Sequence, residues 1–112
     1  MPLINIRTSI AETEAIDELS KAISLKMAHL TGKPEKYVMT CIQTNVQMLF
    51  GGQKDYSCYV EVKSIGALNP SKMSFELCNT INKILGIDID RIYINFEDVE
   101  AKNWGYNAST FG

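Results

Sequence analysis

The chain has 112 residues, of which 46% are hydrophobic and 21% are charged, and its formal net charge is −2. This length and composition are typical of one globular domain over residues 1–112 and exclude an intrinsically disordered chain. Charges of both signs are interspersed, so there is no basic stripe to neutralise phosphates, and we expect neither nucleic acid nor a membrane as a partner.

The N-terminal segment has no basic leader followed by an apolar stretch, and no segment approaches the ~20 apolar residues of a membrane span. We therefore predict a cytoplasmic protein without a signal peptide, and leave open secretion by a route that needs none. The three cysteines, Cys41, Cys58 and Cys78, are far apart, and with the single histidine, His29, they offer no metal-ligand spacing. Free thiols and no bound metal are expected.

The first half of the chain has the pattern of a strand, a helix and a second strand. Residues 3–10 are rich in β-branched types, and residues 12–30 carry an apolar stripe at helical spacing. Gly32 and Pro34 follow the last residue of that stripe and predict the end of the helix. Residues 37–42 then have the composition of a strand.

The second half repeats this order of elements. A turn at residues 50–55 precedes a strand that begins at Cys58 and alternates apolar and polar residues to Lys63. Residues 71–85 carry a second helical stripe, and residues 91–97 a fourth strand. The few identities between the halves prove little, but the repeated order predicts a duplication, with halves of about 1–55 and 56–112.

Two β-α-β units predict an α+β fold in which two helices cover one face of a four-stranded sheet. The other face is then uncovered, and the tail places Trp104, Tyr106 and Phe111 in a segment too short for a core of its own. An oligomer is expected, although the pattern does not choose among dimer, trimer and tetramer.

Pro2 is a candidate general base. If Met1 is removed, the nitrogen of Pro2 becomes a secondary amine with a pKa near ~8, which burial or a nearby cation would lower. Lys33, in the turn after the first helix, is a candidate for that cation. The alternatives are a proline without a role in catalysis and a lysine that is only solvated at a helix C-terminus.

Tyr93 and Asn95 are two residues apart on the fourth predicted strand, so both side chains point away from the face that carries Ile92 and Ile94. Together a hydroxyl and an amide can orient a carbonyl or carboxylate group. The alternative is an ordinary solvent-facing strand. Cys58 falls on the apolar face of its strand with no histidine to activate it, and we interpret it as a packed thiol.

Five separated segments, taken together, resemble the macrophage migration inhibitory factor and D-dopachrome tautomerase family over the whole chain. They are Pro2, Thr31-Gly32-Lys33-Pro34 followed by Tyr37, Ser64-Ile65-Gly66, Asp90-Arg91-Ile92-Tyr93-Ile94-Asn95, and Asn107-Ala108-Ser109-Thr110-Phe111. The resemblance implies a barrel-like homotrimer with three active sites at subunit boundaries. Pro2, Lys33 and Ile65 would come from one subunit and Tyr93 and Asn95 from its neighbour, with Tyr37, Tyr106 and Phe111 at the rim.

The activity that the resemblance implies is keto-enol tautomerisation of small aromatic keto or enol acids, of the phenylpyruvate and dopachrome type, without a cofactor. Two positions differ from the family pattern. Ser57 and Val60 stand where some animal members have a C-x-x-C pair, so thiol-disulfide activity is not expected, and Trp104 replaces a small aliphatic residue at the cleft mouth. The alternatives are a cytokine-like signalling or binding protein with a vestigial pocket, and an oligomeric scaffold with an unused cleft.

Overall fold

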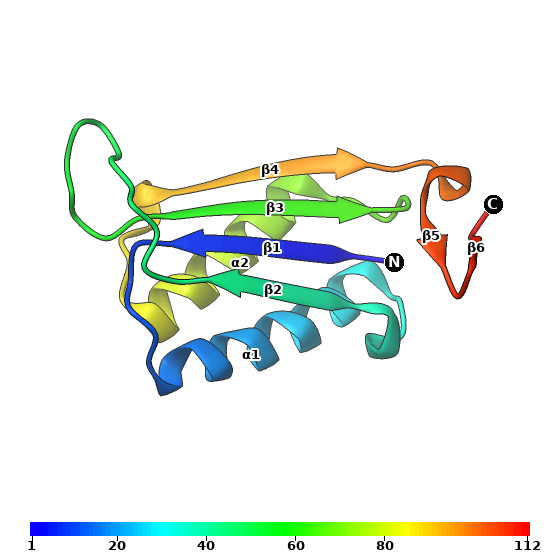
Figure 1. Ribbon diagram of the computed structural model, residues 1–112, viewed down its shortest axis with the longest axis horizontal. Helices are drawn as coiled ribbons and strands as arrows, with labels where there is room; N and C mark the ends of the chain where they lie inside the picture. The colour runs from blue at the N-terminus through cyan, green and yellow to red at the C-terminus, as the bar shows by residue number, and fades with distance from the viewer.

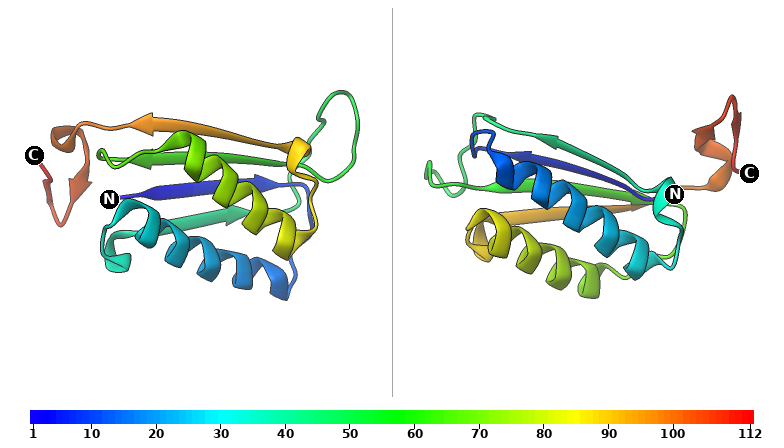
Figure 2. Two further views of the ribbon diagram at one scale, coloured as in Figure 1. Left: turned by 180° about the vertical axis from the view of Figure 1, so that it is seen from behind. Right: turned by 90° about the horizontal axis from the view of Figure 1, so that it is seen from below.

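The computed structural model describes all residues, Met1–Gly112, as a sheet with two helices on one of its faces (Figure 1). Seen from behind and from below, both helices lie against the same side of the sheet (Figure 2). No helix has the length and apolar character needed to cross a membrane. The main elements in chain order are β1 (Leu3–Thr8), α1 (Glu14–Thr31), β2 (Met39–Gln43), β3 (Cys58–Ser64), α2 (Pro70–Leu85) and β4 (Ile92–Asp98).

The four strands lie in the order β2-β1-β3-β4. β1 is parallel to β2 and β3 is parallel to β4, whereas the central pair, β1 and β3, is antiparallel. Each parallel pair is joined through one helix, so the structure consists of two β-α-β units that meet between β1 and β3. The predicted α+β architecture is confirmed.

Capping residues fix both ends of each helix. Thr13 accepts a hydrogen bond from the backbone N–H of Ala15 at the start of α1, and Asn69 has the same role at the start of α2. Gly32 and Gly86 end the helices with φ of 68° and 74°, a left-handed conformation that glycine adopts without a steric penalty. The glycine signals in the sequence therefore mark the two helix ends correctly.

The hydrophobic core fills the space between the sheet and the helices. The strands contribute the residues on their inner face, and the helices contribute their apolar stripes, as the periodicity predicts. The core residues with essentially no exposed surface are Ile4, Ile6, Leu19, Ile23, Met27, Val60, Val62, Met73, Leu77, Ile81 and Ile87. Cys58 also lies in this core, which confirms that it is a packed residue.

Three segments differ from the sequence-based expectation. The first strand ends at Thr8 rather than at residue 10. The second strand begins at Met39 rather than at residue 37, because the chain after Pro34 first makes a 3-10 turn, Glu35–Tyr37. The tail contains a 3-10 turn, Ala101–Asn103, and a short hairpin of β5 (Gly105–Tyr106) and β6 (Ser109–Thr110). This hairpin lies beyond the end of the sheet, near the N-terminus (Figure 1).

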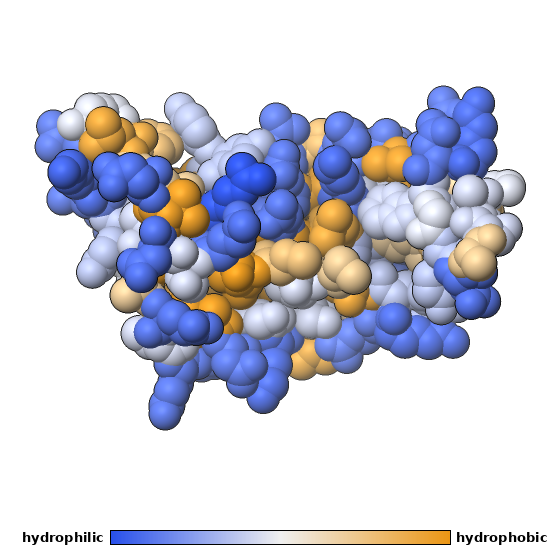
Figure 3. Space-filling view, viewed as in Figure 1, coloured by the Kyte–Doolittle hydropathy of each residue, from blue (hydrophilic) through white to orange (hydrophobic).

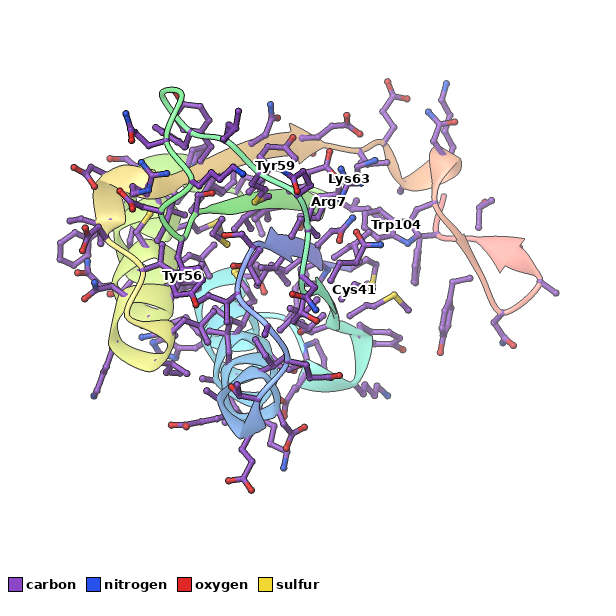
Figure 4. All side chains as sticks on the ribbon, turned by 60° about the vertical axis from the view of Figure 1, so that its left-hand side comes forward. Arg7, Cys41, Tyr56, Tyr59, Lys63 and Trp104 are labelled. Atoms are coloured by element: carbon purple, nitrogen blue, oxygen red, sulfur yellow. The ribbon has the colours of Figure 1, made fainter.

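The face of the sheet opposite the helices is open, and polar side chains and apolar ones are mixed over it (Figure 3). It carries the alternate residues of all four strands, with Arg7 donating a hydrogen bond to Gln43 at 3.2 Å and Lys63 paired with Glu97 at 3.9 Å. Figure 4 shows Arg7, Tyr59 and Lys63 over this face. The face is therefore uncovered by the helices, as the sequence predicts, and its exposed residues include Met39, which is 60% exposed.

Candidate active site

A groove of about 860 Å³ opens where the N-terminus, the turn before β2, the end of β4 and the tail come together. Its lining joins residues from both ends of the chain. The lining includes a set of aromatic residues together with the N-terminal proline and a lysine: Pro2, Lys36, Tyr37, Trp104, Tyr106 and Phe111. Six of its other residues are Lys63, Glu97, Asp98, Glu100, Asn103 and Gly105.

Pro2 is buried at the start of β1, and the backbone fixes its position. Its carbonyl oxygen accepts a hydrogen bond from the N–H of Met39, at 3.0 Å, so the parallel pairing of β1 with β2 extends to this residue. Burial, followed by the hydrogen bond and the positive charge of Lys33, lowers the pKa of the adjacent Met1 amine from 8.0 to about 6. The surroundings of the N-terminus thus favour a neutral amine at physiological pH.

Lys33 joins two segments that are 32 residues apart in the sequence. Its Nζ donates a hydrogen bond to the backbone carbonyl of Ile65, at 2.7 Å, across the gap between the end of α1 and the loop after β3. Lys33 is half-buried, and its influence on the pKa of the Met1 amine places its ammonium group beside the N-terminus. The structure therefore places Lys33 beside Ile65 and near the N-terminus, although neither Lys33 nor Ile65 is among the residues that line the groove.

Three aromatic rings form one side of the groove. The ring of Tyr37 meets those of Tyr106 and Phe111 edge-on, with centroid distances of 5.6 and 6.2 Å, and Tyr106 and Phe111 stack at 5.1 Å. These contacts attach the tail to the turn before β2, and each aromatic pair adds about 0.5–1.5 kcal/mol beyond the area that it buries. The rim predicted from the sequence is assembled within one chain.

Trp104 also lines the groove and is half-buried. Its backbone N–H donates to Ala101 at 3.2 Å and its carbonyl accepts from Phe111 at 3.2 Å, so both sides of this residue are held by the tail. As a lining residue, Trp104 adds to the groove a flat apolar surface on which an aromatic group can stack.

Tyr93 and Asn95 do not lie in this groove. Tyr93 is 65% exposed on the open face of the sheet. It lies opposite Tyr59 of β3, which in turn lies opposite Arg7 of β1, so Tyr93 and Arg7 are at the same level of the sheet. Arg7 is five residues along β1 from Pro2, a separation of about 17 Å at strand spacing. The side chains of Tyr93 and Asn95 do point away from the core, as predicted, but neither residue lines the groove, and within one chain Tyr93 is too far from Pro2 to share a substrate with it.

Tyr93 lies instead against a loop that Arg91 holds in place. The Arg91 guanidinium donates hydrogen bonds to backbone carbonyls of the segment 50–56, including Asp55 at 2.9 Å and Tyr56 at 3.0 Å. Phe50 in this segment packs on the Tyr93 ring, at a centroid distance of 4.7 Å. Because Arg91 fixes the loop, the position of the Tyr93 side chain is fixed as well.

The other candidate nucleophiles and metal ligands lie outside the groove. Burial raises the pKa of the Cys58 thiol to about 12, which leaves it protonated and unreactive. Cys41 is exposed on the open face of the sheet. No group of three His, Cys, Asp or Glu side chains is close enough to hold a metal ion.

Lys36 is one of the groove residues that the sequence analysis missed. Its ammonium group lies over the ring of Tyr37, 5.1 Å from the centroid. The signal in the sequence was its position directly before an aromatic residue in a turn that contains a second lysine, Lys33. Surface lysines are common, so the position of Lys36 in the sequence does not by itself predict a functional role. Its role is suggested only by the location of the turn at the groove.

The fold and the groove define a class of small α+β proteins that includes several solved structures. A macrophage migration inhibitory factor homologue from Prochlorococcus marinus has a TM-score of 0.93 and 52% identity, covering 98% of this chain and 99% of the other. The macrophage migration inhibitory factor of Trichinella spiralis has a TM-score of 0.92 and 29% identity, covering 97% and 99%.

Sequence comparison gives the same result. A curated relative, the macrophage migration inhibitory factor of Xenopus laevis, is 35% identical over 99% of both chains. The family model described as Macrophage migration inhibitory factor (MIF) matches residues 1–112. The chain therefore belongs to the macrophage migration inhibitory factor family, and the resemblance drawn from its sequence is confirmed.

Proposed function

We propose that residues 1–112 form a single tautomerase domain that catalyses keto-enol tautomerisation of small aromatic keto acids, with the amine of Pro2 as the general base. The observation that carries this proposal is the environment of the N-terminus. Burial and Lys33 lower the pKa of the Met1 amine to about 6, and removal of Met1 exposes the Pro2 amine to the same neighbours. A neutral secondary amine at physiological pH is what a general base requires.

The reaction needs only proton transfers. The neutral Pro2 nitrogen takes a proton from the carbon beside the keto group, and the electron pair of that C–H bond moves to form the enol or enolate. The protonated Pro2 then returns the proton to the oxygen, and in the reverse direction to the carbon. No electrons leave the substrate, so the reaction is balanced without a cofactor.

In this mechanism Lys33 and the backbone amide of Ile65 bind the substrate carboxylate or the charge that develops on the enolate oxygen. A half-buried ammonium group is suited to this role because charge interactions strengthen as water is excluded. Its bond to the Ile65 carbonyl holds it beside the N-terminus. Tyr37, Tyr106 and Phe111 then form the rim around the aromatic ring of the substrate, and Trp104 limits its size.

We propose that the active assembly is a homotrimer with sites at the subunit boundaries, as the family resemblance implies. Two observations support it. The outer strands, β2 and β4, have free backbone edges that another chain can pair with. Tyr93 and Asn95 are remote from Pro2 in one chain, so they reach the substrate only if a neighbouring subunit supplies them.

The test is an ultraviolet assay of phenylpyruvate ketonisation and enolisation with protein whose mass confirms the loss of Met1. We expect turnover by the wild-type protein and its loss in Pro2→Gly, while the Pro2→Gly oligomer has the same mass as the wild type. If Pro2→Gly turns over phenylpyruvate at the wild-type rate, Pro2 is not the base and the proposed mechanism is wrong.

A second candidate is a cytokine-like signalling or binding protein whose tautomerase pocket is vestigial. The names of the relatives favour it, since they describe inhibition of macrophage migration rather than a reaction. This candidate predicts no turnover by the processed protein, together with binding to a cell-surface partner that is unchanged in Pro2→Gly.

A further inference from the structure

We propose that Lys36 gives the groove a second site for an anionic group, so that its preferred substrates are aromatic keto acids with an additional carboxylate on the ring. The inference rests on the proposed function, because the keto acid end of the substrate is bound beside Pro2 and Lys33. It adds to that function a preference for dianions, which nothing in the proposed proton transfer requires.

Two of the three carboxylates that line the groove pair with lysines. Glu97 pairs with Lys63 at 3.9 Å, and Glu100 pairs with Lys102 at 3.4 Å. Asp98 accepts a hydrogen bond from a backbone N–H at 2.9 Å. Glu97 in turn offsets the positive charge of Lys63, so Lys63 attracts an anionic ligand only weakly.

Lys36 has no acidic partner. Its ammonium group lies over the Tyr37 ring and forms no ion pair. The adjacent carboxylate, Glu35, instead accepts a hydrogen bond from the hydroxyl of Ser24 on α1, at 2.9 Å. Of the two lysines that line the groove, Lys36 is therefore the one that forms no ion pair, and it lies beside an aromatic ring.

The positions of the two lysines suggest the shape of the ligand. Lys33 and Lys36 are three residues apart in one turn, so their Cα atoms are at most about 11 Å from each other. Lys33 lies beside the N-terminus and Lys36 at the rim, with the Tyr37 ring next to it. A molecule with a carboxylate at each end of an aromatic ring matches this order of cation, apolar surface and cation.

Lys36 is exposed, which sets the size of the expected effect. An ion pair between exposed groups contributes little binding free energy, and the corresponding preference for a dianion is about two- to fivefold in kcat/KM. Because salt screens exposed charges, the preference must shrink as the ionic strength rises from 0.01 to 1 M, over which the Debye length falls from about 30 Å to about 3 Å.

The experiment compares two ligands that differ only in charge, phenylpyruvate with a para-carboxylate and phenylpyruvate with a para-carboxamide. The ratio of their kcat/KM values is measured for the processed wild type, for Lys36→Gln and for the control Lys83→Gln. Lys83 lies in the last turn of α2, outside the groove, and its replacement changes the net charge by the same amount. Binding of both ligands is followed in parallel by the fluorescence of Trp104, the only tryptophan.

We expect a ratio above one at low salt for the wild type and for Lys83→Gln, and a ratio near one for Lys36→Gln. An unchanged ratio in Lys36→Gln overturns the inference, even if both compounds are turned over and the proposed function holds. Conversely, if no variant shows turnover but the binding affinities show the same Lys36-dependent preference, the anion site stands and the proposed function fails.

Discussion

Lys33 shows how one side chain can control both the position and the chemistry of the N-terminus. Its Nζ is tied to the Ile65 carbonyl at 2.7 Å, and together with burial its charge lowers the pKa of the neighbouring amine. A positive charge disfavours protonation of a nearby amine, and burial acts in the same direction because it penalises the charged form. Both effects increase the fraction of free base at neutral pH.

The pH dependence of turnover tests this coupling. If the Pro2 amine is the base, kcat/KM rises with pH through the pKa of that amine, because only the neutral form accepts a proton. In the processed wild type we expect the inflection below the ordinary value of 8.0, as for the Met1 amine. Lys33→Gln removes the cation, so the pKa rises and the inflection moves to higher pH.

The measurement is the pH profile of kcat/KM for phenylpyruvate, with Lys26→Gln as the control. Lys26 lies on α1 and pairs with Glu76 of α2, at 3.1 Å, outside the groove. An inflection that shifts equally in both variants, or that stays in place in Lys33→Gln, would contradict the coupling between Lys33 and the amine.

At the scale of elements, the sequence predicts the helices and strands whose apolar residues recur at a regular spacing. The stripes of α1 and α2 and the alternation in β3 follow from burial on one face, so they can be recognised before the fold is known. Tyr37 was assigned to a strand because apolar and β-branched residues follow it, but Pro34 precedes a 3-10 turn that ends at this residue. Local geometry set by one proline overrides composition there.

The C-terminal hairpin illustrates a turn with an unusual sequence. Asn107 and Ala108 both have positive φ, 52° and 63°, as the two central residues of a tight hairpin turn require. Asparagine is common at such a position, but alanine is not, because its Cβ disfavours the left-handed region. The usual Asn-Gly signal is missing, so the hairpin could not be recognised from the sequence.

The contribution of the helical stripe to stability can be measured with two leucines of α1. Leu19 has no exposed surface, whereas Leu25 is 61% exposed. We expect Leu19→Ala to lower the free energy of unfolding by about 2–5 kcal/mol, because the transfer energy is lost and a cavity forms. Leu25→Ala should change it by no more than about 0.5 kcal/mol. Denaturant unfolding at one chain concentration gives both values, and equal losses would refute the packing described here.

At the scale of the whole molecule, the site is much less predictable from the sequence than the fold. Pro2, Lys33 and Ile65 lie far apart in the chain, and only the fold places the turn after α1 beside the loop after β3. The family resemblance supplied this grouping, whereas spacing alone did not. Lys36 was missed because its importance depends on which way its turn faces.

The position of Tyr93 makes the assembly testable. If sites form between subunits, Pro2 comes from one chain and Tyr93 and Asn95 from the next. We expect Pro2→Gly and the double variant Tyr93→Ala/Asn95→Ala to be weakly active alone. Mixed trimers assembled from equal amounts should regain about one quarter of the sites, since each site takes its two parts independently from neighbouring chains.

The mixing experiment is read from phenylpyruvate turnover after denaturation and joint refolding, with each variant refolded alone as the reference. Recovered activity indicates shared sites. Turnover that equals the mean of the two separate preparations would mean that each chain carries a complete site, and the proposal of boundary sites would be wrong.

The central claim is that the free amine of Pro2 is the base, and the most direct test compares the same chain with and without Met1. Retention of Met1 converts the Pro2 nitrogen into a non-basic amide and leaves every side chain unchanged. We predict phenylpyruvate turnover by the processed protein and none above background by the unprocessed protein, with the masses of both verified. Equal turnover by the two forms would contradict the claim.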